Sequence, residues 1–265
     1  MAIGFIGAGN MGGALATAAA KTVGGNRLLV ADADVQKAQT LADTLGAAVA
    51  DNATVAAECD CIFLGVKPQM MEGVLTLLVP IFSAREEKPV LISMAAGLSV
   101  ACIRQWSGVD TVIRIMPNTP VAVGEGMIQY SAADAVSAAQ KEAFVAMMAR
   151  AGRLDEIPER LIDAASSVSG CGPAFAYLFM EALADGGVEC GLPRAQALEY
   201  AAQMMLGAAK MVLETDRHPG ALKDAVCSPG GTTIAGVHAL EAGGFRSLAM
   251  DAVTAAYDRT LELKK

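Results

Sequence analysis

Short apolar runs and longer amphipathic stretches alternate over the first 157 residues. The apolar runs, bounded by glycine, proline or aspartate, predict buried strands at 2–7, 27–32, 47–51, 61–66, 89–95 and 110–117. The stretches between them show helical periodicity, at 11–25, 34–46, 53–59, 69–82 and 100–106. This alternation predicts a parallel sheet covered by helices on both faces. We further expect an edge strand at 125–131, a helix at 134–152 and a last strand at 152–157.

From Pro158 onward the pattern predicts helices only. They are expected at 159–170, 174–191, 193–216, 220–226, 232–243 and 245–265. Residues 171–173, "CGP", mark a kink or a helix start. We therefore expect two domains: an α/β domain over 1–157 and an all-helical domain over 158–265.

Three glycines follow the first predicted strand: Gly7, Gly9 and Gly12 in "GFIGAGNMGGAL". Between a strand and a helix, the first glycine permits a tight turn, the second admits a pyrophosphate to the backbone, and the third lets helix and strand touch. The helix then offers free N–H groups and the positive end of its dipole. Alone the spacing is weakly specific, but inside an alternating domain it predicts dinucleotide binding.

Two aspartates, Asp32 and Asp34, end the second predicted strand. A carboxylate there can accept hydrogen bonds from a ribose 2′-OH, which favours NAD(H). The alternative for Asp34 is that it caps the next helix. No arginine lies beside them to bind a 2′-phosphate, and Lys37 is a poor substitute.

Three further stretches end predicted strands: "GVKPQ" (65–69), "SMAAG" (93–97) and "RIMPNTP" (114–120). Ligands of open α/β sheets lie beyond the carboxyl ends of the strands. The small residues of 95–97 would let the backbone approach a flat ring. Asn118 could anchor a nicotinamide or a neighbouring loop, and we favour the loop.

Composition narrows the function further. The net charge is −8 over 265 residues, which argues against nucleic acid or an anionic membrane as the main partner. The six cysteines have no C-x-x-C spacing and there are two histidines, so we expect no metal site. Most of the cysteines lie inside apolar runs and are expected to be reduced, buried thiols, with Cys227 the exception. The first twenty residues carry no charged side chain, but glycines and Asn10 interrupt their apolar block. We expect a cytoplasmic protein rather than an exported one.

In the helical domain, one turn stands out, "CSPGGTTIAGVHALE" (227–241). Its proline and glycines form a turn from which two threonines open a helix. The N–H groups of Gly231, Thr232 and Thr233 would converge on an anion such as a substrate carboxylate. The alternative is a helix start that binds no ligand. His218 and His238 are isolated, and we expect structural roles for both.

The turn also carries a resemblance. Residues 218–241, "HPGALKDAVCSPGGTTIAGVHALE", together with "GFIGAGNMGGAL", "GVKPQ", "SMAAG", "RIMPNTP", "SGCGPAFAY" and "EALADGGVECGLPRAQAL", resemble the pyrroline-5-carboxylate reductase family. The resemblance spans nearly the whole chain. It implies a Rossmann domain, a helical domain that interlocks with a partner into a homodimer or a higher oligomer of dimers, and reduction of 1-pyrroline-5-carboxylate to L-proline by NADPH or NADH. This is the last step of proline biosynthesis.

The resemblance also implies roles for individual residues. The substrate carboxylate would be held by Ser228, Gly230, Gly231, Thr232 and Thr233, with Thr233 facing the ring nitrogen and the turn facing the cofactor domain across the dimer. The implied cofactor contacts, with Asp32 added from the residues themselves, are Gly7, Ala8, Gly9, Asn10, Met11, Gly12, Asp32, Asn52, Val66, Lys67, Pro68, Ala95, Ala96 and Gly97. Family members often carry a small hydroxyl residue near the end of the second strand, suited to a 2′-phosphate, where this chain has "VADAD".

Two other functions compete. A β-hydroxyacid dehydrogenase shares the two-domain plan, but it would need a helix-borne lysine, and the candidates Lys210 and Lys223 lack the expected glycine-rich context. A dimer that senses nucleotides without turnover would have no evident use for the 228–233 turn.

Overall fold

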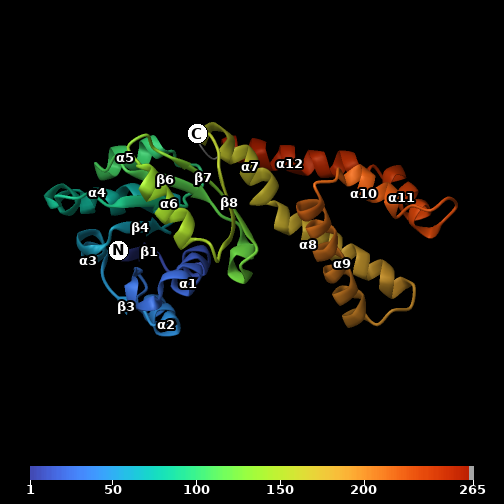
Figure 1. The fold of residues 1–265 in the computed structure, drawn as a ribbon, viewed down its shortest axis with the longest axis horizontal. Helices are drawn as coiled ribbons and strands as arrows, with labels where there is room; N and C mark the ends of the chain where they lie inside the picture. The colour runs from blue at the N-terminus through green and yellow to red at the C-terminus, as the bar shows by residue number, and fades with distance from the viewer. Residues whose placement is uncertain (263–265) are drawn as a thin grey trace. The chain divides into compact units, whose positions relative to one another are not determined.

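The computed structural model of this chain describes residues 1–262, which form two compact units (Figure 1). The first unit comprises Met1–Cys171 together with the end of the last helix from Tyr257 on, and the second comprises Gly172–Ala256. The residues "CGP" mark the start of a helix, since α8 begins at Gly172.

The first unit contains one eight-stranded sheet, ordered β3-β2-β1-β4-β5-β6-β7-β8. Its strands are β1 (Ile3–Ile6), β2 (Leu28–Ala31), β3 (Ala48–Val49), β4 (Cys61–Leu64), β5 (Val90–Ser93), β6 (Val112–Met116), β7 (Gly126–Ala132) and β8 (Gly152–Glu156). The first six strands pair in parallel, as the alternating pattern predicts.

The prediction that 125–131 forms an edge strand is wrong. Strand β7 lies inside the sheet, antiparallel to β6 and parallel to β8, so the edges are β3 and β8. The polar sequence of β8, with Arg153, Asp155 and Glu156 exposed, suits an edge. The position of β8 beyond β7 depends on pairing between strands, which the local sequence pattern does not encode.

Helices cover both faces of the sheet. Those of the first unit are α1 (Asn10–Val23), α2 (Val35–Leu45), α3 (Asn52–Glu58), α4 (Pro68–Ala84), α5 (Val100–Ser107), α6 (Ala138–Met147) and α7 (Ile162–Ser169). Side chains of α1 and α6 pack with Phe5 and Phe63 on one face, and those of α3, α4 and α5 pack with Ile62 and Leu64 on the other. Successive residues of one strand thus point to opposite, equally apolar faces, which explains why β4 is apolar throughout.

The second unit consists of helices, as predicted after Pro158. They are α8 (Gly172–Glu189), α9 (Arg194–Thr215), α10 (Pro219–Ala225), α11 (Thr232–Ala242) and α12 (Phe245–Glu262), the last of which ends in the first unit. Among the described residues of these helices only Ala184, Ala197 and Ala201 are buried, while many large apolar side chains are exposed. A soluble monomer rarely exposes such a surface, so these helices are suited to pack against a second chain.

Candidate functional site

The glycine loop after β1 is explained by packing at two positions and by open space at the third. Gly7 has φ +111°, and a Cβ there would lie 2.6 Å from the backbone of Gly65. A Cβ on Gly12 would lie 2.2 Å from the carbonyl oxygen of Gly7. A Cβ on Gly9 would meet nothing within 4 Å. The first and third glycines are therefore required by the fold, whereas the second leaves room for a ligand against the backbone.

The loop leads directly into the start of a helix. Gly9 is the N-cap residue of α1, in an extended conformation, and no side chain caps the helix. The first N–H groups of α1 therefore have no side-chain partner and can donate to a phosphate. This cradle fits the diphosphate of a dinucleotide.

The strand register brings the other predicted cofactor residues to the same edge of the sheet. Ile6 pairs with both Ala31 and Leu64, and Leu64 pairs with Ser93. The loops after β1, β2, β4 and β5 therefore lie together at the carboxyl ends of the strands. The predicted residues at this edge are Gly7, Ala8, Gly9, Asn10, Met11, Gly12, Asp32, Val66, Lys67, Pro68, Ala95, Ala96 and Gly97.

Asp32 binds the glycine loop directly. Its Oδ2 accepts a hydrogen bond from the Ala8 N–H at 2.6 Å, and its Oδ1 accepts one from the Asp34 N–H at 2.8 Å. Asp34 caps α2, with its side chain accepting from the N–H groups of Gln36 and Lys37. The capping alternative for Asp34 is confirmed.

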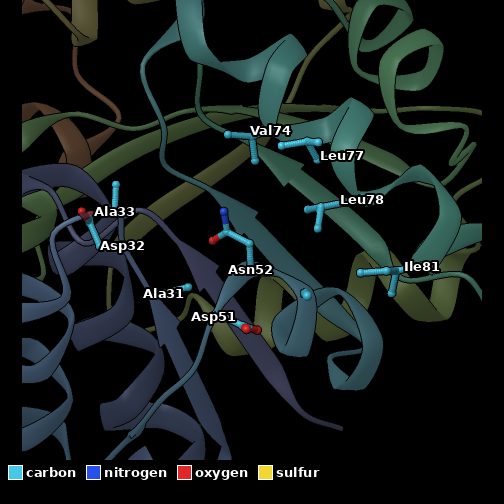
Figure 2. Close-up of a pocket in the computed structure, with 10 residues that line it drawn as sticks. Ala31, Asp32, Ala33, Asp51, Asn52, Val74, Leu77, Leu78 and Ile81 are labelled. Atoms are coloured by element: carbon cyan, nitrogen blue, oxygen red, sulfur yellow. The ribbon is translucent and has the colours of Figure 1, made fainter.

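A cavity of about 410 Å³ opens beside Asp32 (Figure 2). The residues that line it come from the end of β2, the start of α3 and one side of α4: Ala31, Asp32, Ala33, Asp51, Asn52, Ala53, Val74, Leu77, Leu78 and Ile81. The predicted contacts Asp32 and Asn52 thus share one cavity, with a carboxylate and an amide at one end and aliphatic side chains at the other.

The aliphatic wall of this cavity was missed by the sequence analysis. Leu77 is 79% exposed although it is a large apolar residue. The sequence offered one indication of this wall. A helix that covers one face of a sheet needs a single apolar side, whereas residues 74–82 are apolar on more than one side. An apolar wall opposite polar groups suits a nucleoside, whose flat ring is apolar on its faces.

Asn118 has a structural role, as favoured from the sequence, but its partners lie on helix α7 and strand β7 rather than on a neighbouring loop. Its Nδ2 donates to the carbonyl oxygen of Ser169 at 2.9 Å, and its Oδ1 accepts from the Met127 N–H at 2.9 Å. Both polar atoms of the amide are therefore used inside the protein.

A buried arginine close to Asn118 in sequence was also missed. The side chain of Arg114, on β6, is 3% exposed and pairs with Asp163 at 2.9 Å and with Glu159 at 3.3 Å. The Oε1 atom of Glu159 also accepts from the N–H of Val100, at 2.7 Å. These contacts fix α7 to the sheet, and nothing in the sequence around "VIRIM" marks the arginine as buried.

The 228–233 turn, in the second unit, is built by its glycines. Gly230 has φ +67°, and the N–H of Gly231 donates to the carbonyl oxygen of Ser228 at 3.0 Å. Helix α11 begins at Thr232 with no side-chain cap, and Thr232 and Thr233 are exposed. Ser228, Gly230, Gly231, Thr232 and Thr233 thus form one compact turn at an uncapped helix start.

Three titratable side chains, those of His218, Cys59 and Cys61, contribute to the fold. His218 caps α10, its Nδ1 accepting from the Gly220 N–H at 3.0 Å, so its expected structural role is confirmed. Burial raises the pKa of Cys59 to about 12 and that of Cys61 to about 11, which keeps both thiols protonated. In residues 1–262 there is no group of three His, Cys, Asp or Glu side chains that could hold a metal ion. Over the same residues, no helix combines the length and hydropathy needed to cross a bilayer.

Comparison with known proteins gives a consistent result over the whole chain. A family model described as pyrroline-5-carboxylate reductase dimerisation matches residues 159–263, and one described as NADP oxidoreductase, coenzyme F420-dependent, matches residues 2–97. The pyrroline-5-carboxylate reductase of Arabidopsis thaliana is 43% identical, over 99% of this chain and 95% of its own length. Pyrroline-5-carboxylate reductase 2 of Homo sapiens is 38% identical, over 100% of this chain and 84% of its own.

Solved structures agree. A pyrroline-5-carboxylate reductase from Coxiella burnetii superposes with a TM-score of 0.90 at 34% identity, covering 99% of this chain and 98% of that one. The pyrroline carboxylate reductase of Plasmodium falciparum, solved with NADP bound, gives 0.88 at 32% identity over 100% and 98%. The sheet order, the glycine cradle and the helical second unit are thus accounted for together: this chain belongs to the pyrroline-5-carboxylate reductase family.

Proposed function

We propose that this chain reduces 1-pyrroline-5-carboxylate to L-proline with NADPH or NADH, as the last step of proline biosynthesis. The observation that carries the proposal is the glycine cradle, in which packing fixes Gly7 and Gly12 while Gly9 stays open beside an uncapped helix. Family membership adds the substrate, because the curated relatives are named for it.

The cofactor would lie along the carboxyl edge of the sheet. The Gly7–Gly12 loop would hold the diphosphate with its amide groups. Asp32 and Asn52 would face the adenosine half from the cavity they share. The strand ends after β4 and β5, at 66–68 and 95–97, would support the nicotinamide half, where the buried Ala95 and the small residues after it keep side chains away from a flat ring.

The substrate would be held by the 228–233 turn. The N–H groups at the start of α11 would bind the carboxylate, and Ser228 and Gly230 would shape the turn. A bound dihydronicotinamide supplies the hydride. The imine nitrogen arrives protonated as an iminium, so little acid catalysis is required, and the Thr233 hydroxyl would orient the nitrogen by a hydrogen bond.

We further propose a homodimer, or a higher oligomer of dimers, built by the helices after Pro158. The exposed apolar side chains of α8, α9 and α12 support it, including Leu178, Leu213 and Met250, which are 68%, 61% and 70% exposed. We keep the proposed division into a cofactor domain over 1–157 and a substrate and dimerisation domain over 158–265. In that arrangement the turn would meet the cofactor domain of the partner. A cytoplasmic location is supported by the six free cysteines.

The test is a reductase assay with both cofactors. Purified protein, 1-pyrroline-5-carboxylate and NADH or NADPH should lose the absorbance of the reduced cofactor and form L-proline in equal amount. Parallel reactions replace the imine with a β-hydroxyacid and oxidised cofactor. Oxidation of the hydroxyacid without imine reduction would favour the dehydrogenase, and nucleotide binding with no turnover would favour the sensor.

A further inference from the structure

Asp32 occupies the position where the two kinds of dinucleotide differ. It directly follows β2 and lines the cavity that Asn52 and the aliphatic side of α4 complete (Figure 2). In a dinucleotide held by the glycine loop, the adenosine ribose lies past the end of the second strand. NADH presents a 2′-hydroxyl there, and NADPH presents a phosphate with a charge between −1.5 and −2 at about pH 7.

Four backbone N–H groups around this position are already bonded to carboxylates. Asp32 accepts from the N–H groups of Ala8 and Asp34, at 2.6 and 2.8 Å. Asp34 accepts from those of Gln36 and Lys37, at 3.1 and 3.3 Å. These four amides are thus paired with the chain's own acids, and a 2′-phosphate would have to displace those acids to bind them.

The charges around the position are unfavourable to a phosphate as well. Two cavities flank the turn after β2, and the charged side chains that line them are Asp32, Asp34, Lys37 and Asp51. Lys37 is the one cation among them, it is 65% exposed, and its Nζ lies 3.7 Å from a carboxylate oxygen of Asp34. The balance is two negative charges, before a ligand adds its own.

We infer that Asp32 makes this chain select NADH over NADPH, an inference that rests on the proposed function. Its carboxylate keeps a lone pair free on each oxygen, and a ribose 2′-hydroxyl can donate to it. A 2′-phosphate meets a like charge at hydrogen-bonding range instead, with neither an arginine nor an unpaired lysine on the flanking cavities to offset it. Pairing with backbone amides holds the carboxylate in place, so it cannot easily swing away.

The test measures binding without turnover. Calorimetric titration of the wild-type protein should give a dissociation constant for NADH at least about tenfold below that for NADPH, the effect of one unfavourable charge contact. The fragments 5′-AMP and 2′,5′-ADP should compete with NADH in the same order. For the phosphorylated fragment the penalty should grow as pH rises from about 5 to 7.5, because its second ionisation falls near pH 6.

Two variants and a control separate charge from structure. Asp32→Ser opens space for a phosphate, and Asp32→Asn removes the charge at nearly constant size. Both should lower the NADH preference by about tenfold or more. Asp43→Asn, which removes the same charge from an exposed position on α2 away from both cavities, should leave the preference unchanged.

The inference is overturned if wild-type protein binds NADPH as tightly as NADH, or if neither Asp32 variant changes the ratio. Failure of the proposed function would look different, since neither dinucleotide would then bind. Tight, selective NADH binding without imine reduction would support the inference and contradict the proposed reaction.

Discussion

Alanine at Gly9 and at Gly12 should have opposite consequences, although the two residues are three positions apart in one loop. A Cβ on Gly12 would lie 2.2 Å from the Gly7 carbonyl oxygen, against 3.4 Å for an ordinary contact, so one of the two must move by about 1.2 Å. That carbonyl belongs to a residue whose N–H donates to Ala31 at 2.7 Å, which resists the movement. The same methyl group on Gly9 would meet nothing within 4 Å.

The magnitudes follow from these distances. Overpacking of a tight site costs about 1–3 kcal/mol, and the better helix propensity of alanine returns up to about 1 kcal/mol, so Gly12→Ala should lower the free energy of unfolding by about 1–2 kcal/mol. In a domain of this size the melting temperature then falls by about 2–8 °C. Gly9 has φ −69° and ψ −177°, which alanine adopts freely, so Gly9→Ala should cost only about 0.5 kcal/mol as a poorer helix cap.

Gly9→Ala, which hardly affects stability, should strongly weaken cofactor binding. A phosphate oxygen at hydrogen-bonding distance from the loop amides leaves no room for a methyl group on Gly9, so the dissociation constant for NADH should rise at least about tenfold. Chemical unfolding and calorimetric titration measure the two quantities. Gly73→Ala on α4 is the matched control: a Cβ there also meets nothing, and this exposed glycine lines neither cavity. It should stabilise the protein by up to about 1 kcal/mol and leave binding unchanged.

The reasoning fails if Gly9→Ala binds NADH as the wild type does, because the open space would then have no connection with the cofactor. It also fails if Gly12→Ala is as stable as the wild type, because the helix–strand contact would then not require glycine.

Three further predictions concern other parts of the chain. Thr233→Ala should lower kcat/KM for the imine by a factor that corresponds to about 1–3 kcal/mol of lost transition-state stabilisation. An unchanged rate would remove this hydroxyl from the mechanism. Asn118→Ala should lower the free energy of unfolding by about 1–3 kcal/mol in denaturant titration, since it leaves the partly buried N–H of Met127 and the partly buried carbonyl of Ser169 unpaired; a change below about 0.5 kcal/mol would refute the anchoring role. Iodoacetamide at mildly alkaline pH should label the exposed Cys190 while Cys59 and Cys61 react only after unfolding. Labelling of Cys59 and Cys61 in the folded protein as fast as in the unfolded chain would contradict their burial. Burial raises the folded pKa of the two thiols to about 12 and 11 from 9.0, so the stability gained by keeping them protonated is complete below about pH 9 and is lost as pH rises toward those values.

The order of strands and helices could be predicted because each element carries its own period. Buried strands such as β4 are apolar at every position, and amphipathic helices such as α2 end at a glycine with positive φ, Gly46. The neighbours of each strand could not be predicted in this way, and the assignment of β7 to an edge of the sheet was therefore wrong. Which strand lies beyond it depends on pairing over a distance, and a seven-residue strand of mixed apolar and polar residues is equally suited to an edge or to the interior.

The candidate site shows the same division. The spacing of Gly7, Gly9 and Gly12 between a strand and a helix predicted a phosphate cradle, and the structure shows Gly7 and Gly12 fixed by packing and Gly9 in open space. The hydrogen bond from Ala8 to Asp32, which joins residues 24 positions apart, was not predictable from spacing. Neither was the pairing of Arg114 with Asp163, because an arginine in a strand sequence gives no sign of being buried.

The sequence by itself determined the elements of this protein, the glycine turn and the family to which it belongs, because periodicity and turn chemistry are properties of neighbouring residues. Only the tertiary structure decided which distant segments are in contact. It places β8 beside β7, Asp32 against the glycine loop, and the aliphatic side of α4 in the same cavity as Asn52. Those contacts are set by sheet register and packing between distant segments, and no local stretch of the chain specifies them.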